Sequence, residues 1–573
     1  MNFEHPSNED LLDACRSNRL VQVLEKIPLE RLGEVGEALA TIHQSGIVDV
    51  AGVLINLKWS ELRYGELLVI ARTFRGFMPA SSFPPAEFTS LVHEMHLRLG
   101  KIHEHTLYEG FKDWATKHPS GARAVAERLA EQTDESPYFG LALEGWRQYD
   151  QQGALGLALL ATEDQRPMIR RQAILALAGF VAPPDDVRRS AARRLSALII
   201  AGDLEARRAA IISGTSMLSS APEGIPEIVL ALKAAAIDPP REIRFELITG
   251  YVRDKKAYPD DLRASVFELM KTVTNEDVET LNLVDMALYD MDPSSQRESF
   301  EDLLISIIRT DDGPSLKSFK SAVHRLQTAG SRTVGWFVIK WLLEGDVAVC
   351  REIHNLFPPL DETLHDFDIN EFKLTEAEVL YLARKAFGYL HFLHGPAVSL
   401  LYVCLSALGP ASRQALEDHI AAFWLRNYPG DLLHFDSIQA TFPREGVDGS
   451  ISRMREAVES YERILHEMPI NRALMPSSGE RRIQADLKHS RDGEIMRVAK
   501  ENSIFGSFVH TTTILYGRSS VTYMYSGEGQ EPIRQVIPFG THEVRTPNPQ
   551  MDVLSPTRLN FMLFRFRQER RPS

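Results

Sequence analysis

The sequence contains few cysteines, and they stand far apart. Only Cys15, Cys350 and Cys404 occur among 573 residues, and no two of them form a CxxC pair. This spacing excludes a zinc ribbon and a disulfide framework, and it is typical of a protein from a reducing compartment. We therefore expect a cytoplasmic location.

The sequence also lacks a hydrophobic run that is long enough to cross a bilayer. Its most apolar stretch, AVSLLYVCLSALG at 397–409, lies between Pro396 and Pro410 and is shorter than the roughly 20 residues of a spanning helix. The start, MNFEHPSNEDLLDAC, is acidic and has no apolar core, so we expect no signal peptide. We predict a buried helix at 397–409 and no membrane partner.

Short motifs of nucleotide-driven and triad chemistry are missing as well. The chain has no GxxxxGKS/T, no GxSxG, no GxGxxG after a strand pattern and no EF-hand loop. We therefore predict no catalytic residues and no cofactors, and a binding role is favoured over an enzyme.

Charge is distributed unevenly along the chain. The formal net charge is −14, which disfavours wholesale wrapping by nucleic acid or an anionic membrane. Residues 476–573 nevertheless carry 14 Lys and Arg against 10 Asp and Glu. The last hundred residues are therefore expected to be electrostatically distinct from the rest.

What the sequence does contain is a repeated helical pattern. RPMIRRQAILALAGF (166–180), LEARRAAI (204–211) and REIRFELI (241–248) align on Arg171, Arg208 and Arg244, at intervals of 37 and 36 residues. An acidic or proline-bearing turn precedes each segment, and a second segment with helical periodicity lies in each interval. Two helices and a turn repeated at this length indicate a helical solenoid.

The pattern resembles the HEAT-repeat family, in which a turn with Asp or Pro leads into an Arg-bearing second helix. The resemblance is clearest over residues 150–250, and near Leu281 the periodicity continues without the arginine. It implies stacked helical hairpins with a long surface for partners.

We predict a mainly α fold, a HEAT-like α-solenoid with a small C-terminal β-rich (α+β) domain. The expected parts are N-terminal solenoid helices at 1–140, HEAT-like repeats at 141–360, C-terminal solenoid helices at 361–428, a linker and helix at 429–475, and the β-rich domain at 476–573. The β prediction rests on segments with a period of two, at 507–517, 519–527, 532–539 and 558–568.

Nine arginines lie between Arg166 and Arg208, against four acidic residues. One interpretation is a basic stripe that binds phosphate, nucleic acid or an acidic partner. The other is a ladder in which repeat arginines such as Arg171 and Arg208 bond to turn acids and neighbouring carbonyls. The predicted binding residues are Arg188, Arg189, Arg193, Arg194, Arg170 and Arg207.

Basic residues near aromatics form a second candidate surface in the last hundred residues, namely Arg481, Arg482, Lys488, Arg565 and Arg567. Such a combination can hold single-stranded nucleic acid by stacking. If 558–568 is a strand, however, Phe564 and Phe566 share one face while the arginines share the other, which indicates buried phenylalanines and solvated arginines.

Histidines gather in HEMHLRLGKIHEH, at 93–105. On one helix His93, His96 and His103 would share a face, where imidazoles can bind a transition metal. Because HExxH spacing is absent and Gly100 interrupts the pattern, a solvated polar face is favoured and we predict no metal site. His391 and His394 are interpreted as capped core histidines.

Two functions follow from these observations. The favoured one is a non-catalytic protein–protein interaction scaffold or adaptor, as a subunit of a multi-component bacterial complex, with homo-oligomers through the C-terminal domain left open. The alternative is a DNA-binding or DNA-repair enzyme, similar to the HEAT-like alkylpurine glycosylases, that holds nucleic acid on its arginine-rich repeats. The chain departs from that family in its larger size and in its acidic balance.

Overall fold

The computed structural model of the chain divides into two compact units. Unit 1 contains Met1–Phe337 and Ala348–Leu356, and unit 2 contains Val338–Val347 and Phe357–Ser573. The structure describes residues 6–99, 103–132, 136–221, 225–310, 313–358, 361–469 and 477–572, the last range with gaps at 484, 487–489, 491–509, 517–518, 526–532 and 539–548. The five-part division expected from the sequence stays a prediction.

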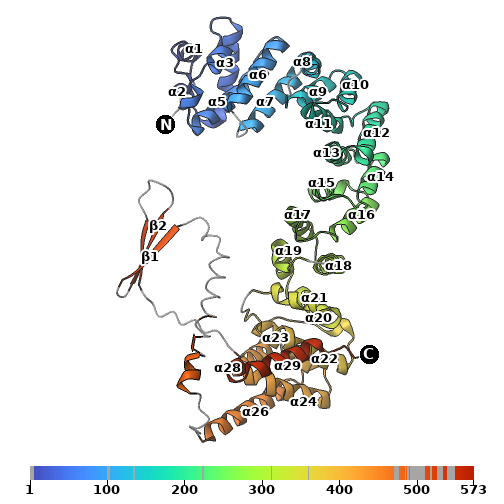
Figure 1. Cartoon of the computed structure of the whole chain (residues 1–573), viewed down its shortest axis with the longest axis vertical. Coiled ribbons are helices and arrows are strands. Elements are labelled where there is room, and N and C mark those ends of the chain that lie inside the picture. The colour runs from blue at the N-terminus through green and yellow to red at the C-terminus, as the bar shows by residue number, and fades with distance from the viewer. Residues whose placement is uncertain are drawn as a thin grey trace. The chain divides into compact units, whose positions relative to one another are not determined.

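Unit 1 is built from helices that alternate between two rows (Figure 1). The odd row holds α3 (Leu32–Gln44), α5 (Tyr64–Ala80), α7 (Glu104–Lys117), α9 (Phe139–Arg147), α11 (Pro167–Ala176), α13 (Leu204–Ser220), α15 (Arg241–Arg253), α17 (Val278–Tyr289) and α19 (Lys320–Thr328). The even row holds α4 (Val50–Ile55), α6 (Pro85–Leu99), α8 (Pro119–Glu131), α10 (Gln151–Ala161), α12 (Asp185–Ala201), α14 (Pro226–Ala235), α16 (Asp260–Met270) and α18 (Arg297–Ile308). α1 (Asn8–Arg16) and α2 (Leu20–Leu24) precede them.

Each helix of unit 1 packs on the next member of its own row, and its apolar side faces the other row. Leu195 and Ile199 of α12 are fully buried, as are Ala210 and Ile211 of α13. The core therefore extends from repeat to repeat along the rows. This packing confirms the predicted HEAT-like helical solenoid.

Turns that contain aspartate or proline begin helices of unit 1. The Asp150 carboxylate caps α10 by accepting a bond from the amide of Gly153 at 2.9 Å, and Asp203 caps α13 through the amide of Ala206 at 2.9 Å. Pro167 occupies the first turn of α11. An N–H group at this position has no partner within the helix, so proline loses no hydrogen bond there. Aspartate and proline at these positions satisfy the free amide groups of a helix start.

Unit 2 is also mainly helical. Its elements include α22 (Glu376–Tyr389), α23 (His394–Ala407), α24 (Pro410–His419), the π-helical segment η9 (Ile420–Leu425), α25 (Leu432–Thr441) and α26 (Asp448–Glu467). α23 contains most of the apolar stretch singled out in the sequence, and it is buried on all sides from His394 to Leu405. Among the helices that the structure describes, none has the length and apolar character needed to cross a bilayer.

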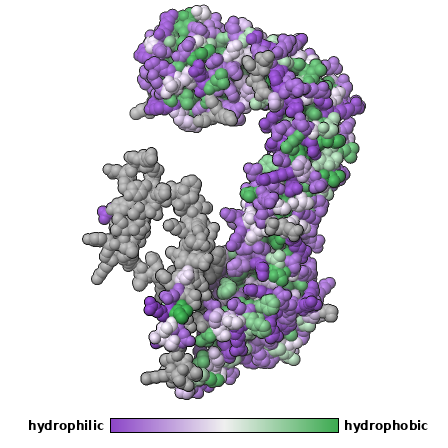
Figure 2. Space-filling model, in the orientation of Figure 1, coloured by the Kyte–Doolittle hydropathy of each residue, from purple (hydrophilic) through white to green (hydrophobic). Residues whose placement is uncertain are grey.

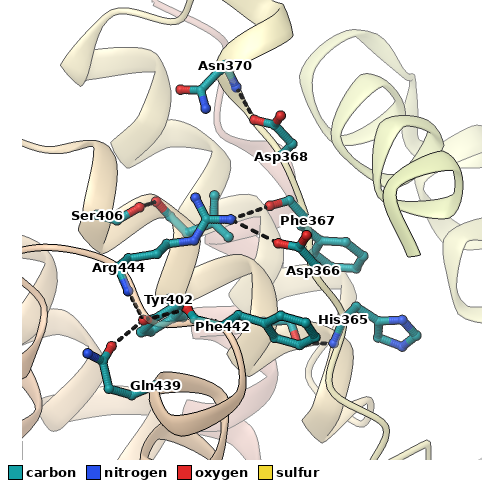
Figure 3. Close-up of polar contacts among 12 residues, drawn as sticks. His365, Asp366, Phe367, Asp368, Asn370, Tyr402, Ser406, Gln439, Phe442 and Arg444 are labelled. Carbon is teal, nitrogen blue, oxygen red and sulfur yellow. Dashed lines mark hydrogen bonds and ion pairs between the residues drawn. The ribbon is translucent and has the colours of Figure 1, made fainter. Parts of the chain in front are cut away.

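Residues 361–369, which precede the short turn η8 (Asn370–Phe372) and α22, have no regular secondary structure and are held in an extended form (Figure 3). The Arg444 guanidinium donates to the carbonyl of Phe367 at 2.8 Å and contacts the Asp366 carboxylate at 3.2 Å. The amide of His365 donates to the Ser399 hydroxyl of α23 at 2.9 Å. Main-chain groups of this stretch are thus satisfied by side chains of the helical unit.

The predicted small β-rich domain at 476–573 is wrong, because the chain end at 556–568 is a helix that packs on α22 of the mainly helical unit 2, and the strands described in this range are confined to 510–538. Residues 558–568, expected as a strand, lie in helix α29 (Pro556–Gln568), which packs on α22. Pro556 starts the helix, and Leu559 and Leu563 recur at helical spacing on its buried side. The apolar surface of α22 therefore selects the helical period over the strand period.

Among the described residues, the strands lie between α26 and α29 in the sequence. β1 (His510–Tyr516), β2 (Ser519–Tyr525) and β3 (Ile533–Pro538) form one antiparallel sheet in the order β1-β2-β3. The contacts of α29 with α22 join the chain end to the helical part of unit 2.

Candidate interaction surface

Arginines of the odd row form a ladder of ion pairs from each helix to the next. The pairs are Arg170–Asp203, Arg208–Glu246 and Arg244–Asp277, with N–O distances of 2.8, 2.9 and 3.1 Å. Hydrogen bonding to the buried Glu246 carboxylate raises the pKa of Arg208 above its usual value. A guanidinium held in this way is committed to the repeat stack, so the ladder interpretation accounts for Arg170 and Arg208.

Arg171 does not take the place in the ladder that the sequence alignment indicates. Its neighbour Arg170 makes the ion pair instead, and Arg171 is exposed without a described ion pair or hydrogen bond. One position around a helix turns a side chain by about 100 degrees, so the register of a repeat read from sequence alone can miss by one residue.

The arginines of α12 differ in whether their side chains make ion pairs or hydrogen bonds within the chain. Arg188 pairs with Asp185 at 2.9 Å, and Arg189 donates to the Asp185 carbonyl at 3.3 Å. Arg194 reaches the turn after α10, where it contacts the Thr162 hydroxyl at 2.8 Å. Of this group, Arg193 alone is exposed without a partner among the described residues. The remaining candidate of unit 1, Arg207, donates to the carbonyl of Ile199 at 3.1 Å.

DNA binding through α12 stays a prediction, and the geometry sets an expected outcome for it. We expect a chain carrying R188A, R189A, R193A and R194A to bind a short DNA duplex at low salt no more weakly than the wild type. The reason is that three of these four arginines already bond to carboxylates or carbonyls of the chain. Fluorescence anisotropy over a salt series measures this, and salt-sensitive binding lost in the variant would establish the DNA interpretation instead.

Even-row helices α10, α12 and α14 expose several aliphatic side chains to solvent. The exposed fractions are 76% for Leu160, 61% for Ile200, 65% for Leu230 and 79% for Ile237, which lies two residues after the end of α14. Ala197 and Ala234 are exposed between them. We call these six residues the even-row apolar face. Figure 2 shows hydrophobic residues gathered over α12 and α14 on this side of unit 1.

The helices that carry the even-row apolar face are neighbours in the stack. The bond from Arg194 to Thr162 sets the end of α10, with Leu160, level with the second half of α12. A Cβ built on Gly214 would lie 3.2 Å from Ile228 and 3.3 Å from Ile199, so these two side chains are neighbours. Helices α10, α12 and α14 therefore pack in succession along the even row, and each carries exposed aliphatic residues.

Charged residues are exposed on α12 itself and on the even-row helices at either end of the face. Arg189 and Arg193 are exposed on the first half of α12. On the flanking helices, exposed positions are occupied by Arg128 of α8 and by Asp261 and Glu268 of α16. An apolar patch with a polar rim is the usual anatomy of a protein interaction surface. Sequence reasoning missed this face because it followed the arginines of α12 and not its aliphatic residues.

The candidate basic residues near the C-terminus differ in their exposure and in their bonds. Arg481 and Arg482 are exposed, and Lys488 lies outside the described residues. On α29, Arg565 is exposed, whereas the Arg567 guanidinium donates to the carbonyl of Gly388 at 2.7 Å. The grouping of these residues as one surface stays a prediction.

The expected separation of phenylalanines and arginines on 558–568 is wrong, because the segment is a helix. Phe561 and Phe564 are exposed beside Arg565, and Phe566 packs against Phe387 and Phe423. Strand geometry would have put Phe564 and Phe566 on the same face.

The three histidines of the weak metal candidate lie on different elements. His93 and His96 are on α6, whereas His103 precedes α7. The His96 ring contacts the Tyr138 hydroxyl at 3.2 Å, and burial lowers the pKa of both His96 and His103. Within the described ranges, no three metal-ligating side chains gather around one point.

The other two histidines are buried in unit 2. His394 bonds to the buried Asp431 carboxylate at 2.9 Å, and Asp431 also accepts a bond from the Trp424 indole at 2.8 Å. His391 has no described partner at either ring nitrogen, and burial lowers its pKa to about 3. His394 is therefore a bonded core histidine, and His391 is a neutral one.

Comparisons with known proteins do not assign the chain to a family. No family model matches, and no curated protein matches. Similar solved structures include a homology model of the full-length AP-3 complex, at 12% identity over 69% of this chain and 81% of that chain, with a TM-score of 0.33. Kap121p bound to Nup53p matches at 10% identity over 93% of this chain and 53% of that chain, with a TM-score of 0.30. The Pds5–Scc1 complex also matches, at 10% identity over 87% of this chain and 86% of that chain, with a TM-score of 0.24. At these scores the similarities support no inference about function.

Proposed function

We propose that the protein is a non-catalytic interaction scaffold, a subunit of a larger complex, which binds a partner protein on the even-row apolar face. The observation that carries the proposal is the exposure of Leu160, Ile200, Leu230 and Ile237 on adjacent helices. Removing apolar surface from water contributes about 25 cal/mol per Å². A partner that covers this face therefore gains binding free energy from side chains that are largely exposed in unit 1.

The rim of the even-row apolar face defines the chemistry of the partner. Arg193 is exposed without a described partner, and Arg189 is exposed with only a carbonyl bond. We infer that the partner presents aliphatic or aromatic side chains to the face and carboxylates to these two arginines. Opposite charges at an interface rim fix orientation and speed association.

A site-specific photo-cross-linker tests the proposal in the full chain. We expect benzoylphenylalanine in place of Leu230 to capture one protein in the native host, identified by mass spectrometry. The same substitution at Leu97 should capture none, because Leu97 is equally exposed but lies on α6, outside the face. Adding I200D should lower the cross-link yield about tenfold, a cost of about 1.4 kcal/mol, because it buries a charge in the interface.

Four outcomes of this experiment contradict the proposal. Equal capture from positions 230 and 97 would show non-specific contact. Capture of a second copy of this chain would make the face an oligomer interface, and capture of nucleic acid would favour the DNA alternative. A cross-link that is insensitive to both I200D and R193E would place the partner elsewhere.

A further inference from the structure

A pocket of about 310 Å³ lies between three successive helices of the odd row, α9, α11 and α13. α11 packs on both of the other helices (Figure 1). Three polar side chains line the pocket, one from each helix, namely Arg147 of α9, Gln172 of α11 and Ser216 of α13. All three residues are half-buried, so the pocket gathers polar groups that are partly removed from water.

The three polar side chains have their bonding groups free. Arg147, Gln172 and Ser216 make no side-chain hydrogen bond or ion pair with any described residue. The Arg147 guanidinium packs with its carbon 5.7 Å from the centroid of the Phe180 ring, and burial lowers the pKa of Arg147 below its usual value. Because a partly buried cation without a counter-ion is costly, its place in a pocket indicates a ligand that supplies negative charge.

A glycine leaves the space that the Arg147 guanidinium occupies. Gly179 ends the short turn η4 (Leu177–Gly179), which directly follows α11 and also lines the pocket. A Cβ on Gly179 would overlap the Arg147 Nη1 atom. A larger residue at this position would therefore move the guanidinium out of its place.

The charges around the pocket match one carboxylate. Glu144 lines the pocket too, but its carboxylate pairs with Lys112 at 3.0 Å, so Arg147 is the uncompensated charge among the described lining residues. A carboxylate accepts two parallel bonds from one guanidinium. A phosphate dianion would instead keep excess negative charge beside Glu144. Leu141 and Leu175 line the pocket as well, so the carboxylate is expected on a short hydrocarbon chain.

We propose that this pocket is a carboxylate-binding site, in which Arg147 pairs with the carboxylate while the Gln172 amide and the Ser216 hydroxyl donate further hydrogen bonds to it. The ligand is a carboxylate on a short hydrocarbon chain, as in a small free acid or in a glutamate side chain of another protein. The site lies between odd-row helices and does not depend on the even-row apolar face.

Arginine modification tests the site in the full chain. Phenylglyoxal reacts with unpaired arginine side chains, and mass spectrometry of the digested protein gives a separate rate for Arg147. The probes are butyrate, a blocked pentapeptide with one central glutamate, and inorganic phosphate. A dissociation constant of about 1 mM would make the modification of Arg147 about tenfold slower at about 10 mM of the better carboxylate probe. Arg171 is the internal control, because it is exposed without a described partner outside this pocket, and its rate should not change.

Two serine variants test the geometry of the site. Ser216→Ala removes one donor to the carboxylate, so we expect the half-protecting concentration to rise about tenfold, as for the loss of a hydrogen bond to a charged group. Ser219→Ala is the matched control on the same helix. The Ser219 hydroxyl donates to the Thr215 carbonyl at 3.1 Å and does not line the pocket, so this variant should be protected like the wild type.

The outcomes separate the two sources of the carboxylate and decide the proposal. Stronger protection by butyrate would assign the site to free acids, and stronger protection by the glutamate peptide would assign it to a side chain of a partner protein. The same peptide with glutamine should not protect Arg147. Protection by phosphate alone, equal protection of Arg147 and Arg171, or no protection by either carboxylate probe would overturn the proposal. Equal behaviour of the two serine variants would overturn the site as described.

Discussion

Gly36→Ala is expected to destabilise the first repeats of unit 1 by about 3 kcal/mol, at the upper end of the usual cost of overpacking. Gly36 of α3 faces α5, where a Cβ would overlap the carbonyl oxygen of Thr73 and lie 2.6 Å from the amide nitrogen of Phe77. These are backbone atoms of a neighbouring helix, so relief requires the two helices to separate. The expected loss exceeds the gain of about 1 kcal/mol that alanine brings to an isolated helix.

Gly33→Ala provides the matched control for this prediction. Gly33 is on the same helix, and a Cβ there meets no atom within 4 Å. We expect this variant to be as stable as the wild type or slightly more stable. Hydrogen exchange of α3 and α5 measures both effects locally, which suits a repeat protein that need not unfold in one step. Equal protection in the two variants would contradict the close approach of α3 and α5.

Arg453→Met is expected to destabilise unit 2 by about 3 kcal/mol, because it leaves a buried carboxylate without its counter-charge. The Glu417 side chain is only 2% exposed, and it accepts bonds from the Arg453 guanidinium at 2.7 and 2.6 Å. Arg455→Met on the same helix is the control. Its ion pair with Asp436 is largely open to solvent, and such pairs contribute about 0–1 kcal/mol.

The same pair predicts a pH dependence of stability. Burial alone would raise the pKa of Glu417, but its bonds to Arg453 and Ser450 lower it below the usual glutamate value. The stabilisation is therefore present above the pKa of the unfolded chain and is lost as the pH falls through the lower, folded value. In Arg453→Met the carboxyl is expected to favour its protonated form, so the stability gap to the wild type should narrow on acidification. Chemical denaturation at several pH values measures the gap, and a gap independent of pH would contradict the assignment.

The helical-repeat fold could be predicted from the sequence because its signal is local and repeated. Aspartates and prolines that begin helices, apolar residues at helical spacing and arginines at intervals of 37 and 36 residues all indicate the same unit. Two of the three aligned arginines, Arg208 and Arg244, make the expected ladder contacts. Their partners were not predictable, since Glu246 and Asp277 lie more than thirty residues away along the chain.

The even-row apolar face left no distinct trace in the sequence. IPEIVLALKAAAI at 225–237 is apolar around most of its circumference, so its pattern does not tell which residues meet α12 and which meet water. Leu230 and Leu232 are two positions apart, yet the first is exposed and the second is buried. Only the position of the neighbouring helices decides this difference.

By itself the sequence determined the class of fold, since each helical hairpin buries its apolar side on the next and needs only local signals to do so. The tertiary structure decided the conformation of the last helix and the exposure of the even-row apolar face. Residues 558–568 fit a strand pattern, but the surface that buries Leu559, Leu563 and Phe566 is supplied by α22 and η9, far away in the chain. Contacts between distant segments choose among local conformations of similar free energy, and no local pattern contains that choice.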